Sequence, residues 1–132
     1  MQDKFEAEII RLHKFFTDWY NGNISNTDTN FNTLKESLHE KFYIITPNGQ
    51  YIDFFKILDY VQNSYNSKTK EQEFTIEIKN INHRYSFETI HVYTYEEWQI
   101  QDNVKTHRVS SAVFKEEKPD KIQWVAVHET WF

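Results

Sequence analysis

The sequence predicts an α+β fold, with helices in the first half of the chain and a mostly antiparallel sheet in the second. An apolar stripe at spacings of three and four covers residues 3–21 and is typical of an amphipathic helix. Asn48–Gly49, between two apolar runs, is a strong hairpin signal. Alternating segments rich in β-branched and aromatic residues fill residues 73–132 and predict four long strands.

The first helix is expected over residues 3–21, capped by Asp3 and ended by Gly22. Its apolar stripe consists of Phe5, Ile9, Leu12, Phe16 and Trp19. His13 comes directly after Leu12 of this stripe. We expect it to be a partly buried, hydrogen-bonded histidine that could face a cavity. A polar loop over 23–30 and a short helix over 30–39 come next.

The Asn48–Gly49 turn predicts two short strands, Phe42–Thr46 and Gln50–Ile52. Asp53 can cap a third helix over residues 54–66. Polar residues 66–72 then break the helical pattern. Four strands follow in a meander, joined by turns near 85–86, 101–104 and 116–121.

The bulk composition limits the classes of function. A chain of 132 residues forms one domain, residues 1–132, and its 17% aromatic content excludes a disordered chain. The net charge of -5 argues against nucleic acid as a partner. The absence of cysteine excludes disulfides and thiolate chemistry. No apolar run is long enough for a membrane span or a signal sequence, so we expect no membrane partner and a cytoplasmic protein.

The order of elements, together with three motifs, resembles the nuclear transport factor 2-like superfamily, and especially its SnoaL-like and ketosteroid-isomerase-like branches. The motifs are WYNGN at 19–23, VF…W..VHE at 113–129, and the W-x-x-V-H-x-x-W strand at 124–131. The resemblance implies a cystatin-like cone, in which a curved sheet of about six strands wraps around the first helix and encloses a pocket. It also implies homodimers through the outer sheet face.

The isomerase branch can be compared residue by residue. Its members carry a tyrosine donor about a turn and a half before the glycine that closes the first helix, and here that position is Phe15. They place an aspartate base before a proline in the first hairpin, and here that position is Thr46, before Pro47. Neither side chain can do the isomerase chemistry, so steroid isomerase activity is disfavoured.

The predicted inner face of the last strands carries Trp98, Phe114, Val127 and Trp131 and three ionisable residues. A hairpin centred near Asp102 is expected to set Glu96 close to Arg108, and a hairpin folding about the EKPD loop at 117–120 to bring Arg108 near Glu129. The three residues would then form a row across three strands. Burial would raise the pKa of such a carboxyl group and Arg108 would lower it. The row is interpreted either as a structural or ligand-orienting element, the favoured reading, or as a source of a general acid or base.

The candidate pocket residues combine these groups with their neighbours on the expected inner face and on the first helix. They are Glu96, Arg108, Ser110, Glu129, Trp98, Trp131, Thr94, His13 and Trp19. Arg108 would suit an anionic ligand such as a carboxylate. No cofactor is implied. The six histidines show no metal-binding spacing, so no metal is expected.

The opposite face is expected to be large and apolar, which favours a homodimer contact. It would carry Tyr93, Tyr95, Val109, Val113, Trp124, Ala126 and Phe132.

Two classes of function follow. The first is a small-molecule pocket protein that binds or converts a mainly apolar ligand, with or without an acidic group on that ligand. The second is a non-catalytic dimerisation or assembly module with a filled cone. The sequence slightly favours the pocket, because charged groups inside a core are costly without a purpose.

Overall fold

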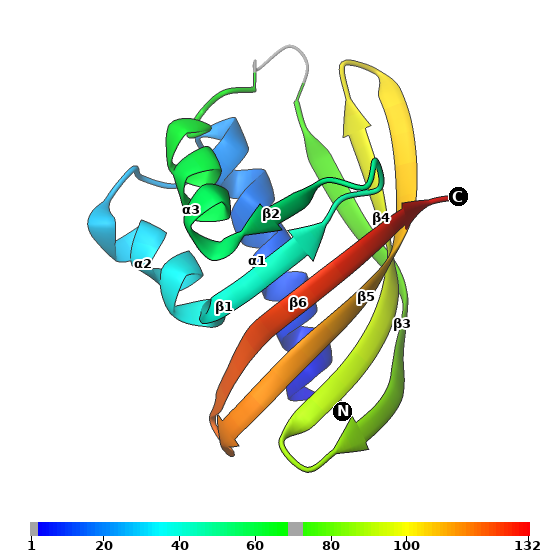
Figure 1. Ribbon diagram of the computed structural model, residues 1–132. Helices are drawn as coiled ribbons and strands as arrows, with labels where there is room; N and C mark the ends of the chain where they lie inside the picture. The colour runs from blue at the N-terminus through cyan, green and yellow to red at the C-terminus, as the bar shows by residue number, and fades with distance from the viewer. Residues whose placement is uncertain (1–2, 69–72) are drawn as a thin grey trace.

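The computed structural model describes residues 3–68 and 73–132 (Figure 1). The predicted polar connection over residues 66–72 therefore lies partly outside the described residues. The elements in chain order are α1 (Lys4–Asn21), α2 (Asp28–Ser37), β1 (Leu38–Ile45), β2 (Tyr51–Asp53), α3 (Phe54–Asn63), β3 (Thr75–Phe87), β4 (Ile90–Gln101), β5 (Val104–Lys118) and β6 (Lys121–Trp131).

The described strands form a 6-stranded sheet in the order β2-β1-β6-β5-β4-β3. Only β1 and β6 are parallel among these neighbours, and the other pairs are antiparallel. The sheet curves around α1, while α2 and α3 lie beside β1 and β2 (Figure 1). The α+β fold with a curved, mostly antiparallel sheet is therefore confirmed.

Helix α1 has the ends that its sequence predicts. The Asp3 carboxylate accepts a hydrogen bond from the Glu6 amide at 2.7 Å, and Gly22 adopts φ 71° at the other end. Glycine takes this left-handed conformation at little steric cost, because it has no Cβ. Most of the predicted stripe is buried in the core, with Ile9 and Trp19 fully covered, while Phe16 is partly buried. In the described residues, no helix has the length and apolar content needed to cross a bilayer.

The central elements also follow their local signals, with shifted ends. Gly49 has φ 83° in the predicted hairpin, and the Asp53 carboxylate accepts from the Lys56 amide at 2.9 Å to cap α3. Helix α2 begins earlier than predicted, because Thr27 caps it. Strand β1 begins at Leu38 instead of residue 42, so the chain passes directly from helix to strand.

The hairpin between β4 and β5 corrects the predicted faces of β4. Its loop is the two residues Asp102 and Asn103, both with positive φ (54° and 65°), and Gln101 pairs with Val104. Glu97 is consequently paired with Arg108, one residue away from the predicted alignment of Glu96 with Arg108. A shift of one residue moves every side chain of a strand to the other face.

The inner face of β4 therefore carries Tyr93, Tyr95 and Glu97, all buried. The prediction that Glu96, Thr94 and Trp98 face inward is wrong: these side chains lie on the outer face. The Glu96 carboxylate accepts hydrogen bonds from its outer neighbours Asn80 and Trp98.

A β-bulge between β5 and β6 corrects a second assignment. Val113 pairs with Ala126, but the next pair is Phe114 with Trp124, so Val125 is the extra residue. The bulge turns Trp124 inward, where it is almost fully buried against Phe114 at 4.5 Å between ring centroids. Three members of the predicted outer row, Tyr93, Tyr95 and Trp124, are thus core residues.

Candidate functional site

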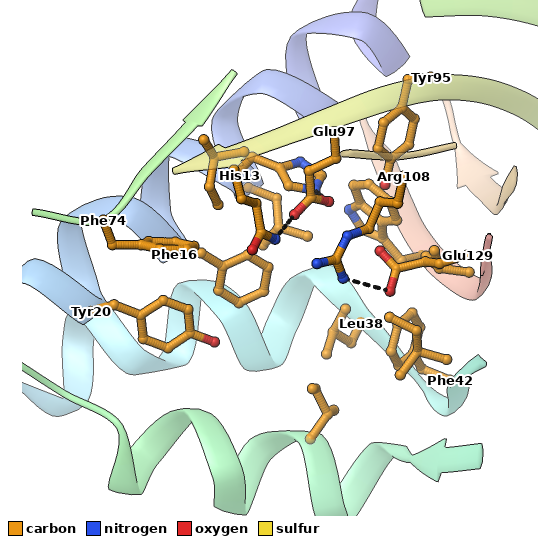
Figure 2. Close-up of a pocket in the computed structure, with 17 residues that line it drawn as sticks. His13, Phe16, Tyr20, Leu38, Phe42, Phe74, Tyr95, Glu97, Arg108 and Glu129 are labelled. Atoms are coloured by element: carbon orange, nitrogen blue, oxygen red, sulfur yellow. Dashed lines mark hydrogen bonds and ion pairs between the residues drawn. The ribbon is translucent and has the colours of Figure 1, made fainter. Parts of the chain in front are cut away.

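A cavity of about 160 Å³ lies between α1, β1, α3 and the inner face of the sheet. Most of its wall is apolar, and its polar groups come from α1 and strands β4, β5 and β6. The apolar lining consists of Leu12, Phe16, Leu38, Phe42, Ile44, Ile57, Phe74, Ile76, Trp124 and Val127. The polar lining consists of His13, Tyr20, Tyr95, Glu97, Gln99, Arg108 and Glu129 (Figure 2).

His13 and Glu97 form a buried pair at one side of the cavity. His13 Nδ1 lies 2.7 Å from the Ile9 carbonyl oxygen, one turn earlier in α1, so this nitrogen carries a hydrogen and donates it. His13 Nε2 lies 3.0 Å from Glu97 Oε1, and two lone pairs would repel at that distance. One proton therefore lies between the imidazole and the carboxyl group.

The pKa shifts of His13 and of Glu97 both favour the charged form of this pair. Burial lowers the pKa of His13, but the Glu97 carboxylate and the Ile9 carbonyl outweigh it, and the pKa is raised overall. Burial raises the pKa of Glu97, but His13 and then Arg108 outweigh it, and the pKa is lowered overall. Gln99 also donates a hydrogen bond to the second Glu97 oxygen. The pair is an imidazolium–carboxylate ion pair without net charge.

Arg108 and Glu129 form a looser second pair. Arg108 Nη1 is 3.4 Å from Glu129 Oε1, and Ser110 Oγ is 3.5 Å from Glu129 Oε2, so both hydrogen bonds are long (Figure 2). The Arg108 Nε atom is buried and has no hydrogen-bond partner within the part of the chain that the structure describes. The guanidinium group lies 4.7 Å from the centroid of the Trp131 ring. Arg108 thus has donors left over for another group.

Glu129 is the carboxyl group that titrates near neutrality. Burial raises its pKa to about 7, the nearby Glu97 carboxylate adds to the rise, and Arg108 opposes both. Tyr95 is enclosed beside it, and burial raises the pKa of Tyr95 well above its ordinary value. Glu129 can therefore accept or donate a proton at physiological pH, whereas Tyr95 stays protonated.

The cavity adjoins a second hollow of about 420 Å³ on the side of α3 and β2. Six side chains line both spaces: Tyr20, Ile44, Ile57, Phe74, Gln99 and Arg108. Polar side chains, among them Thr46, Gln50 and Gln101, line the second hollow. Arg108 therefore lies where an apolar inner space meets a more polar outer one.

The structure divides the predicted site residues into four groups. Arg108, Glu129 and His13 line the cavity. Ser110 lies fully buried behind Glu129, and Trp131 stacks on Arg108 at the edge of the site. Trp19 lies elsewhere in the core, where its Nε1 donates to the Val61 carbonyl oxygen at 2.7 Å.

Glu96, Thr94 and Trp98 are separated from the cavity by the sheet itself, because of the register described above. The main residue that the sequence interpretation missed is Glu97, which occupies the position predicted for Glu96. The two-residue loop Asp102–Asn103 contained the signal, since such a loop pairs Gln101 with Val104. Trp124 was also missed, and nothing in the sequence marks the bulge at Val125. Groups of histidine, aspartate or glutamate that could hold a metal ion do not occur among the described residues.

The sequence matches the family described as "Sucrose-6-phosphate phosphohydrolase C-terminal" over residues 5–132. The chain belongs to this family. No curated protein gives a match to the sequence.

Several solved structures share the fold. An NTF2-like protein of unknown function from Pseudomonas aeruginosa has a TM-score of 0.86 at 20% identity, over 97% of this chain and 98% of that chain. An NTF2-like protein from Cytophaga hutchinsonii has a TM-score of 0.67 at 11% identity, over 99% of this chain and 100% of that one. An uncharacterized protein with a cystatin-like fold from Caulobacter vibrioides has a TM-score of 0.66 at 12% identity, over 96% of this chain and 89% of that chain. The predicted nuclear transport factor 2-like fold is thereby confirmed.

Proposed function

We propose that residues 1–132 act as a small-molecule-binding domain whose ligand occupies the inner cavity and places a polar group against Arg108. The observation that carries this proposal is the side chain of Arg108, which lines the cavity and makes one long hydrogen bond among the described residues, while its buried Nε atom has no partner there. A buried donor without a partner is costly, and a ligand oxygen would supply the missing acceptor.

The size and the wall of the cavity define the rest of the ligand. A cavity of about 160 Å³ is comparable to engineered cavities of roughly 150 Å³ that bind benzene. The aliphatic and aromatic lining favours an apolar body of that size, such as one six-membered ring. The ligand is therefore a ring or short chain with a single polar group.

The family name does not extend this proposal to sucrose 6-phosphate. The inner cavity of about 160 Å³ is too small for a disaccharide phosphate, and its apolar wall cannot satisfy the hydroxyl groups of one. Such a ligand would have to lie in the adjoining hollow of about 420 Å³, outside the space proposed here. The alternative of a filled cone is also less favoured, because an empty cavity beside four ionisable groups costs stability that a purely structural core would avoid.

The test is a nuclear magnetic resonance titration of the whole chain with benzyl alcohol, benzoate and cyclohexanol. We expect saturable shifts at the cavity-lining residues. The cavity-filling variant Ile57→Trp should abolish them, because Ile57 lines the cavity from α3. The matched control is Phe55→Trp, at an exposed position of the same helix, which should bind as the unmodified chain does. Absence of binding at millimolar concentrations, or equal binding by Ile57→Trp, would contradict the proposal.

We also propose a homodimer through the outer sheet face. Exposed apolar side chains support it: Tyr43, Val109 and Phe132 all lie on that face, more than a third accessible. Sedimentation equilibrium should give twice the 16.1 kDa mass of the chain. The variant Val109→Glu should shift the mass to the monomer, and a monomeric unmodified chain at high concentration would refute the proposal.

A further inference from the structure

We propose that the ligand is a small monocarboxylic acid, and that it binds together with one proton that Glu129 holds in the complex. This inference rests on the proposed function and specifies the ligand of the same cavity. Apart from this proton transfer, no covalent bond forms or breaks. The ligand carboxylate pairs with Arg108, and the Glu129 carboxylate takes a proton from solvent or from the incoming acid.

The charged and polar groups that face Glu129 come from three elements. Arg108 and the hydroxyl group of Ser110 face it from β5, Glu97 and Tyr95 from β4, and His13 from α1. The side chains that line the cavity from β1 and α3 are apolar. Because His13 and Glu97 neutralise each other, Arg108 is the cation that Glu129 balances.

This balance leaves room for one carboxylate at Arg108. A guanidinium group can bind a carboxylate through two N–H donors, and Arg108 has donors to spare. Its Nη1 is only 3.4 Å from Glu129 Oε1, so a ligand carboxylate on the same guanidinium group lies within a few ångströms of Glu129. Two carboxylates that close in a partly buried site do not both stay ionised. One proton must therefore accompany the ligand.

Glu129 is the group that takes this proton. Its pKa is about 7 before any ligand arrives, above that of an ordinary carboxylic acid. Its contacts to Arg108 and Ser110 are long, so protonation breaks no strong hydrogen bond. A neutral Glu129 also frees Arg108 for the ligand.

The same balance disfavours dianions. A phosphate monoester would bring a second negative charge, and the other cation lining the cavity, His13, is already paired with Glu97 at 3.0 Å. Lys68 lines only the adjoining outer hollow. The site thus selects for one negative charge on an apolar body.

The experiment is isothermal titration calorimetry of benzoate binding to the full chain from pH 6.5 to 8.5, in pairs of buffers with different ionisation enthalpies. We expect uptake of close to one proton at pH 8.5, and a rise in Kd of about tenfold per pH unit above pH 7.5. Benzyl alcohol, the uncharged analogue, is the matched ligand and should bind with a Kd that changes little over this range. Glu129→Gln should bind benzoate without proton uptake.

Each contrary result has a distinct meaning. If benzyl alcohol and benzoate both bind but benzoate takes up no proton, the inference fails and the proposed function stands. If Glu129→Gln still takes up a proton, the assignment to Glu129 is wrong. If neither compound binds, the proposed function itself fails. Inorganic phosphate should not bind, and competition by phosphate against benzoate would overturn the selection for one negative charge.

Discussion

Replacing Glu129 by glutamine should stabilise the protein at high pH. Glu129 is 7% exposed, and its pKa rises from 4.5 to about 7 on folding, chiefly because burial disfavours the charged form. A carboxyl group with a raised pKa contributes stability that is present below pH 4.5 and is lost as pH rises toward 7. At 1.36 kcal/mol per pKa unit, the loss is about 3 kcal/mol. Glutamine resembles the protonated form at every pH and avoids this loss.

The assay is urea denaturation of both proteins from pH 5 to pH 8. The free energy of unfolding of Glu129→Gln, relative to the unmodified chain, should rise by about 2–3 kcal/mol over this range and level off above pH 7. Glu88→Gln, at an exposed turn, is the matched control and should show no such rise. A difference that stays constant with pH, or that falls as pH rises, would refute the reasoning about Glu129.

Two further predictions concern the buried pair and the glycines. His13→Leu should lower the free energy of unfolding by about 3–5 kcal/mol, because it leaves Glu97 buried without its partner. The double variant His13→Leu/Glu97→Met should lose less than that single change, and an equal or larger loss would contradict the pairing. Gly22→Ala should cost more than Gly49→Ala in urea denaturation, since both have positive φ but only at Gly22 would a Cβ collide with a side chain, that of Asn66. Equal losses would indicate that backbone strain alone matters.

Local chemistry made most of the fold predictable. Caps such as Asp3 and Asp53, the Asn48–Gly49 turn and the apolar periodicity of α1 act within a few residues, so the sequence displays them directly. The ends of α2 and β1 were less predictable, because Leu38 fits a helical stripe and a buried strand equally well.

The site depended on register, which is a property of pairs of strands. The sequence placed Arg108, Ser110 and Glu129 on one face, and the structure has them there. It chose Glu96 over Glu97, because one residue of loop length decides which of two adjacent glutamates faces the cavity. Alternation within a strand cannot resolve that choice; only the hairpin geometry can.

A crystal structure of the protein grown with saturating benzoate tests the central claim most directly. The account predicts the aromatic ring inside the cavity, against Leu12, Phe16 and Val127, with its carboxylate within hydrogen-bonding distance of Arg108. Benzoate bound only at the surface, or a cavity that stays empty while Arg108 pairs closely with Glu129, would contradict it.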